Sequence, residues 1–197
     1  HNIVPVWQAS EKKEFAAYTI RPKIKRLLPD YLTDIPKVTK HPYILDAIQN
    51  KINWDNVLSS LRLDESVRSL DWINPGEKSA QKLLKKIKSS LANYNEQRND
   101  PNLDKLSNMS PFFHYGHIAP QRVALEIKNS NLPLEDKDAY LEEMIVRREL
   151  ADNFCHYEKN YDQFEGFHAW AQKTLNEHRN DEREFVYSPE EFEYSET

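Results

Sequence analysis

A helical repeat of apolar residues is the sequence feature that most limits the fold of this chain. Between residues 75 and 98 apolar side chains recur every three or four positions, which is the period of one helix face. Asn74 can cap this helix, and Pro75 suits its first turn. The helix dipole favours the negative charge of Glu77 near the N-terminus. No stretch alternates long enough to demand a strand, so the sequence predicts an all-α fold.

The same patterns predict a series of helices separated by proline-rich connections. We expect extended chain at 1–10, a loop at 29–42 and an acidic frayed tail at 187–197. A helix over 11–28 is expected to be capped by Ser10 and interrupted at Pro22. The remaining predicted helices are 43–50, 53–61, 75–98, 110–116, 119–129, 136–157 and 167–179.

Scarce residue types exclude several classes of protein. The three glycines lie 40 and 50 residues apart, so neither a dinucleotide fingerprint nor a P-loop can form. The single cysteine excludes an internal disulfide and a multi-cysteine zinc site, and the scattered histidines predict no metal. The longest apolar run is four residues, which excludes a membrane span, and no signal peptide is seen.

Charge is distributed unevenly along the 197 residues. Residues 1–100 hold 17 Lys and Arg against 12 Asp and Glu, whereas residues 101–197 hold 10 against 20. Any contact with DNA must therefore use a local face. The lysines of the 75–98 helix form either a solvated surface or a DNA-facing stripe, and the sequence leaves both open.

Two segments carry candidate chemistry. The long helix at 136–157 places Glu143 and Arg147, and also Arg148 and Asp152, four residues apart. These pairs fit stabilising ion pairs, but they equally fit partners for ligand phosphates or bases. The turn at 107–110 precedes a helix start, where hydroxyl groups and free backbone N–H groups can bind an anion. Simple N-capping by Ser110 is the alternative for that turn.

Six blocks in order resemble the photolyase/cryptochrome family, most closely the class II cyclobutane pyrimidine dimer DNA photolyases. The blocks are VWQASEKKEFAAYTIRPKI (6–24), NPGEKSAQKLL (74–84), YNEQRNDPN (94–102), LSNMSPFFHYGHIAPQRVALE (106–126), VRRELADNFCHY (146–157) and WAQKTLNEHRNDEREFVYS (170–188). The resemblance implies a helical FAD-binding domain and light-driven repair of pyrimidine dimers in DNA by electron transfer from reduced FAD.

Site residues follow from the same resemblance. It assigns cofactor contacts to Tyr94, Ser107, Asn108, Met109, Ser110, Tyr140 and Arg148. Glu143 is expected to hydrogen-bond the damaged bases as the catalytic glutamate, with the adjacent Glu142 as the alternative position. The family often stacks an aromatic ring on the lesion one turn later, where this chain has Arg147 as its lesion contact.

The resemblance also predicts domain organisation and setting. Residues 1–30 are expected to be a linker and first helix after an antenna domain that this chain does not contain. Residues 31–197 are expected to form an FAD-binding domain that is incomplete at its carboxyl end and inactive in isolation. We expect an intracellular monomer, cytoplasmic or, in a eukaryote, nuclear. A cryptochrome-like photoreceptor and a non-catalytic helical module that binds DNA or protein are the alternatives.

Overall fold

The structure is a computed structural model that describes residues 2–43, 52–63, 66, 68 and 70–195. Helices are the only regular elements in this part of the chain, so the predicted all-α fold is confirmed. They are α1 (Val6–Ala9), α2 (Ala17–Tyr31), α3 (Trp54–Ser60), α4 (Glu77–Ser90), α5 (Tyr94–Gln97), α6 (Ser110–His114), α7 (Pro120–Lys128), α8 (Leu134–Leu141), a π-helical segment η1 (Glu142–Arg147), α9 (Arg148–Tyr157), a 3-10 turn η2 (Phe164–Gly166), α10 (Ala169–Glu177) and α11 (Pro189–Tyr194).

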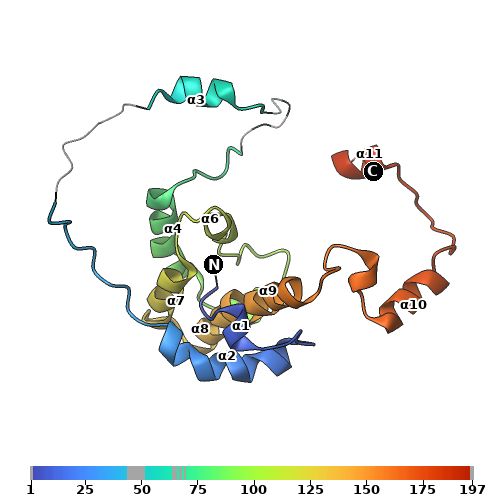
Figure 1. Ribbon diagram of the computed structural model, residues 1–197, viewed down its shortest axis with the longest axis horizontal. Coiled ribbons are helices and arrows are strands. Elements are labelled where there is room, and N and C mark those ends of the chain that lie inside the picture. Colours follow the sequence, from blue (N-terminus) through green and yellow to red (C-terminus); the bar gives the residue numbers. More distant parts are fainter. Residues whose placement is uncertain (1, 44–51, 64–65, 67, 69, 196–197) are drawn as a thin grey trace.

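The continuous rod α8–η1–α9 lies at the centre of the packed helices (Figure 1). Helix α2 crosses the rod at η1, α1 rests on α9, and α5 and α7 pack against α8. Helix α4 packs in turn on α7, at the edge of the cluster. Burial of apolar side chains from all these elements forms one core, which provides most of the driving force for folding. Its fully buried members include Ile20, Ile24, Ile87, Leu91, Met109, Val123 and Ile127.

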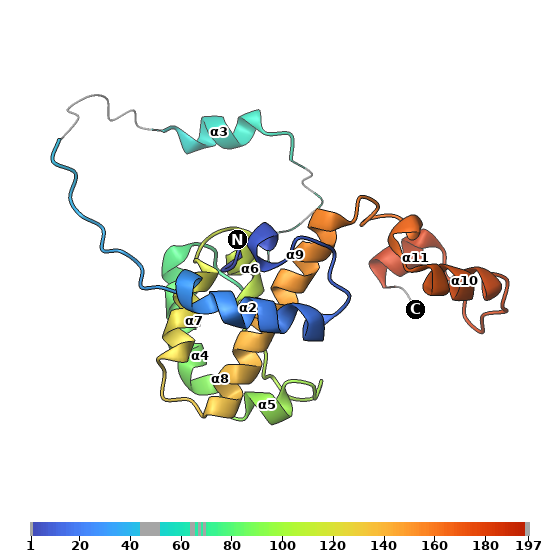
Figure 2. The same ribbon diagram turned by 60° about the horizontal axis from the view of Figure 1, so that its bottom comes forward.

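Three helices lie outside this cluster. Both views show α3 on a long excursion and α10 with α11 beyond the end of α9 (Figures 1 and 2). Their large apolar side chains are exposed, among them Trp54, Trp170 and Phe192. The described part of the chain contains no helix long and apolar enough to cross a bilayer.

Helix α2 differs from its prediction in both start and continuity. It begins at Ala17 with Ala16 as its N-cap, so the expected cap at Ser10 is wrong. It also runs through Pro22 and ends at Tyr31, although proline costs a helix its usual backbone hydrogen bond. Full burial of Ile20 and Ile24 against the core offsets that cost.

The predicted helix 75–98 is divided in the structure. Its first part is α4, whose N-cap is Gly76 and not the expected Asn74. Asn93 then adopts a left-handed conformation with φ 63°, and a separate short helix begins at Tyr94. A left-handed residue cannot continue a right-handed helix, so the apolar repeat alone overestimated the helix length.

The other predicted helices agree with the structure to within a few residues at 53–61, 110–116, 119–129, 136–157 and 167–179. The helix expected at 43–50 falls outside the described residues, apart from residue 43, which is not helical. The prediction of extended chain over 1–10 is wrong at Val6–Ala9, which form the short helix α1. The frayed tail is also wrong, because Ser188 and Glu191 form a reciprocal capping box that starts α11.

One face of α9 holds the amino-terminal segment through polar side chains four residues apart. Glu149 Oε1 accepts hydrogen bonds from the backbone N–H groups of Ile3, at 2.9 Å, and Val4, at 3.2 Å. Asn153 accepts from the Glu14 N–H at 2.7 Å, and the Tyr157 hydroxyl donates to a backbone carbonyl at 2.7 Å. Repeated spacing of four along α9 thus fixes a segment about 140 residues away in sequence.

Burial of the Glu149 carboxylate costs free energy in this arrangement. Its side chain is 2% exposed, and Oε2 has no hydrogen-bond partner within the described residues. Burial raises the pKa of Glu149 from 4.5 to about 7, although the bonds from Val4 and Ile3 oppose the shift. The unfolded chain therefore releases this proton near pH 4.5, and the folded chain retains it until about pH 7.

We predict that Glu149→Gln makes the free energy of unfolding less dependent on pH between pH 4.5 and pH 7. The folded wild type binds the extra proton across this window, so its free energy of unfolding falls as the pH rises, by about 3 kcal/mol in total. The glutamine carbonyl still accepts both backbone bonds and does not titrate. Urea midpoints measured from pH 4.5 to 8 test this, with the exposed Glu182→Gln as control. Parallel pH profiles for wild type and Glu149→Gln would contradict it.

Candidate functional site

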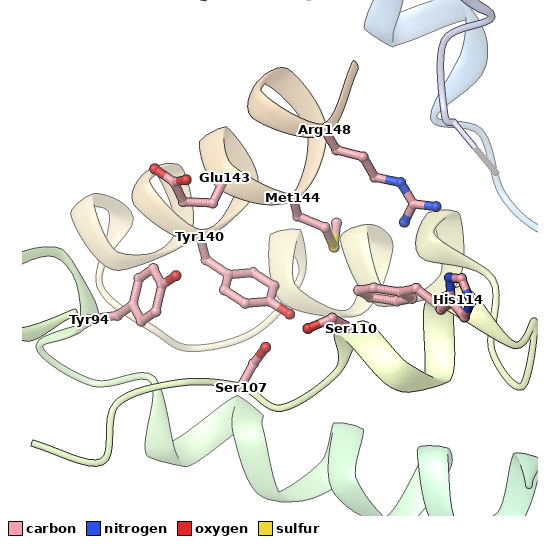
Figure 3. A pocket seen from close by; sticks show the side chains of 9 residues that line it. Tyr94, Ser107, Ser110, His114, Tyr140, Glu143, Met144 and Arg148 are labelled. Carbon is pink, nitrogen blue, oxygen red and sulfur yellow. The ribbon is translucent and has the colours of Figure 1, made fainter. Parts of the chain in front are cut away.

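A hollow of about 430 Å³ opens between α5, the 107–110 turn, α6 and the central rod. Figure 3 shows its side chains, which come from segments far apart in the sequence, around Tyr94, at 107–114 and at 140–148. The lining residues are Tyr94, Ser107, Ser110, Phe113, His114, Tyr140, Glu143, Met144 and Arg148. A size of this order suits a small-molecule ligand or part of a larger one.

Hydroxyl groups gather at one side of the hollow. The side chains of Ser107, Ser110 and Tyr140 point toward one another there (Figure 3). Asn108 between the two serines has φ 54°, so the turn is tight, and Met109 is the N-cap of α6. Ser110 is therefore the first helical residue and makes no side-chain cap bond, so the N-capping alternative is wrong. Its hydroxyl is left available to a ligand.

Tyr140 forms the buried floor of this side. Burial raises the pKa of the Tyr140 phenol to about 12, and the Ser107 hydroxyl partly opposes that shift. The phenol is therefore a neutral hydrogen-bond donor throughout the physiological pH range. Its ring meets Tyr94 edge to face, with centroids 5.5 Å apart.

A buried carboxylate positions Tyr94. Asp136 at the start of α8 is 4% exposed and accepts hydrogen bonds from the N–H groups of Asn93, at 2.8 Å, and Asn95, at 2.9 Å. These charge-assisted bonds hold the left-handed turn that begins α5. The tyrosine between the two asparagines is thereby directed into the hollow.

The two neighbouring glutamates of η1 have different partners. Glu143 lines the hollow, and its Oε1 accepts a hydrogen bond from Arg98 Nη1 at 2.9 Å. Glu142 instead pairs with Arg21 of α2, with a closest contact of 2.7 Å. Of these two glutamates, Glu143 is the one that lines the hollow.

Arg98 joins Glu143 to the rest of the site. Its guanidinium also donates to the Ala139 carbonyl at 3.3 Å and lies 5.8 Å from the centre of the Tyr94 ring. Its Nε is buried without a hydrogen-bond partner among the described residues. Sequence reasoning missed this arginine, although its position four residues after Tyr94 would place both on one helix face.

Neither ion pair expected within the long helix forms in the described chain. Glu143 and Arg147 lie in the π-helical segment, where the spacing of side chains differs from that of an α-helix. Arg148 lies beside the hollow, 5.6 Å from the Phe113 ring, and has no acidic partner among the described residues. That cation is therefore available to an anionic ligand.

The hollow contains six of the residues expected from sequence, namely Tyr94, Ser107, Ser110, Tyr140, Glu143 and Arg148. Three others lie elsewhere. Met109 is fully buried in the core, Asn108 faces a different groove, and Arg147 lines a groove with Phe15 and His168.

Sequence reasoning also missed three residues of the lining, Phe113, His114 and Met144. Met144 follows Tyr140 by one helical turn, which was a usable signal. Within the described residues, no group of three or more His, Cys, Asp or Glu side chains could hold a metal ion.

Comparison with known proteins gives relatives of one kind. No protein-family model matches the chain. It is 44% identical over 199 residues to the deoxyribodipyrimidine photo-lyase of Potorous tridactylus, an alignment that covers 100% of this chain and 37% of that protein. The corresponding protein of Oryza sativa subsp. japonica is 41% identical, with 100% and 40% covered. That of Methanothermobacter thermautotrophicus is 35% identical, with 99% and 43% covered.

All three relatives are photo-lyases. Over its full length the chain is similar to part of each of these photo-lyases, which confirms the resemblance seen in its sequence blocks. It spans about two fifths of the length of the curated relatives that it matches.

We predict that Arg98→Met lowers the free energy of unfolding by about 1 kcal/mol. The variant loses the bond to Glu143, the bond to the Ala139 carbonyl and the cation beside Tyr94. Urea denaturation measures this change. Lys173→Met removes an exposed pair to Glu177 at 3.7 Å and should cost only about 0.3 kcal/mol. Equal losses in the two variants would show that Arg98 adds nothing beyond a surface ion pair.

Proposed function

We propose that this chain supplies part of the flavin- and lesion-binding region of a light-driven deoxyribodipyrimidine photolyase. The observation that carries the proposal is the convergence of three kinds of group on a single hollow. They are two serine hydroxyls, one anchored glutamate and one arginine that has no acidic partner among the described residues. Similarity of the whole chain to part of known photo-lyases supports the same assignment. Repair of pyrimidine dimers, FAD and damaged DNA are the proposed activity, cofactor and partner.

The residues of the hollow fit a flavin dinucleotide. Ser107 and Ser110 offer hydroxyl donors, and Arg148 offers a positive charge that no acidic group in the described part of the chain neutralises. A pyrophosphate group binds to such donors and cations. Tyr94 and Tyr140 supply aromatic surface for the remaining parts of the cofactor. When bound, the reduced flavin supplies an electron on excitation by light.

Glu143 faces the hollow and has one carboxylate oxygen that can accept a hydrogen bond from the lesion. Arg98 occupies Oε1, and Oε2 accepts no hydrogen bond from the described residues. The imide N–H of a flipped pyrimidine is a donor that such an oxygen can accept. The ion pair to Arg98 limits rotation of the carboxylate, so little side-chain entropy remains to be lost when DNA binds. Glu143 thus orients the reacting bases.

We predict that Glu143→Gln lowers light-dependent dimer repair by about tenfold to a hundredfold, because an amide cannot offer two oxygen acceptors to Arg98 and the base. Repair of a thymine-dimer oligonucleotide by the polypeptide that the gene encodes is the measurement. Glu142→Gln, which alters the glutamate paired with Arg21, should retain repair.

Flavin content is recorded in the same samples. Repair that survives in Glu143→Gln and fails in Glu142→Gln would reverse the assignment. Bound flavin with no repair in the wild type would favour a cryptochrome-type photoreceptor, and a protein that binds no flavin would favour a non-catalytic module.

We also predict that Arg148→Met weakens FAD binding by about tenfold to a hundredfold, which is the loss of one charge-assisted interaction with a phosphate. Quenching of flavin fluorescence on titration gives the dissociation constant. Arg147→Met removes the adjacent arginine, whose side chain lies outside the hollow, and should bind FAD as the wild type does. Identical dissociation constants for Arg148→Met and the wild type would exclude Arg148 from the cofactor site.

A further inference from the structure

A second groove, with a lining different from that of the hollow, includes Asn108 of the 107–110 turn. It has a volume of about 380 Å³ and is formed by α4 and the segment that leads into it. Both polar and apolar side chains line it. From α4 these are Ser79, Lys82, Leu83 and Lys86, and from other segments Trp72, Ile73, Asn74, Asn108 and Phe112. This set is named the α4 groove below.

The α4 groove is positively charged. Lys82 and Lys86 are exposed and form no ion pair with any described residue, whereas Lys88 on another side of the helix pairs with Glu126 at 2.7 Å. The one acidic residue of α4, Glu77, accepts a hydrogen bond from Gln81 and not from a lysine. An anion entering the groove would therefore replace water and not a protein carboxylate at these ammonium groups.

The spacing of the charges suits a nucleic-acid strand. Residues four apart on a helix are separated by about 6 Å along its axis, which is comparable with the distance between neighbouring phosphates of an extended strand. Trp72 is 61% exposed beside these lysines, so its ring is accessible to a base. Stacking on an aromatic ring together with backbone contacts from lysines is the usual mode of single-strand binding.

We propose that the α4 groove binds a short single-stranded stretch of nucleic acid, with Lys82 and Lys86 on the phosphates and Trp72 stacked on a base. The side-chain amides of Asn74 and Asn108 provide donors and acceptors for base edges. This site is separate from the hollow that contains Glu143, and it requires neither flavin nor a lesion.

Fluorescence anisotropy with a labelled, undamaged dT oligonucleotide of about 12 nucleotides tests the proposal on the full chain in the dark. Lys82→Ala/Lys86→Ala should weaken binding by tenfold or more and reduce the slope of log K against log salt by about 1.4. Lys78→Ala/Lys85→Ala is the matched control. It removes the same charge from the same helix outside the groove and should change the affinity less than threefold. Equal losses of affinity in the two double variants would show that only the total charge of the helix matters, and would contradict a binding site in the α4 groove.

Trp72→Leu separates stacking from charge. It should weaken binding of the oligonucleotide by about tenfold without altering the salt slope, because base stacking releases no counterions. An abasic oligonucleotide of equal length should bind the wild type and Trp72→Leu equally. Binding of abasic and dT strands with equal affinity by the wild type would identify a general polyanion surface and refute base recognition. Circular dichroism confirms that each variant is folded, and failure of photorepair leaves all these outcomes unaffected.

Discussion

The π-helical segment at the centre of the long rod is the constraint on which the candidate site depends. In an α-helix, residues eight apart differ by about 80° around the axis. A π turn contains more residues than an α turn, so each residue adds less rotation. Tyr140 before the segment and Arg148 after it therefore line the same hollow. The following residue, Glu149, turns away from the hollow and begins the face that holds the amino-terminal segment.

Buried carboxylates that accept backbone N–H groups connect distant parts of this fold. Asp136 accepts two such bonds from the α5 turn, and Glu149 accepts two from the amino-terminal segment. A buried carboxylate without partners is costly, so each docked segment stabilises the carboxylate that it satisfies. These bonds span 41 to 146 residues in sequence, which explains how short helices such as α1 and α5 remain ordered despite low intrinsic stability.

The sequence predicted the elements better than it predicted their ends and partners. Helices with a clear apolar stripe, such as α4 and α7, were found because the stripe faces the core. The break at Asn93 was missed because a carboxylate 43 residues away stabilises it. Resemblance to a family brought six residues of the hollow together. The partners of Glu142 and Glu143 could not be predicted from local sequence, since Arg21 lies in α2 and Arg98 follows α5, both far from η1 in the sequence.

The 107–110 turn serves two surfaces because of one backbone conformation. Ser107 lines the hollow, whereas its neighbour Asn108 lines the α4 groove. Asn108 has φ 54°, a region that asparagine tolerates better than most residues. The full burial of Met109 then fixes the turn to the core between the two surfaces. A β-branched residue at 108 would be strained in this conformation, and relaxing the strain would displace the serine hydroxyl as well as the groove.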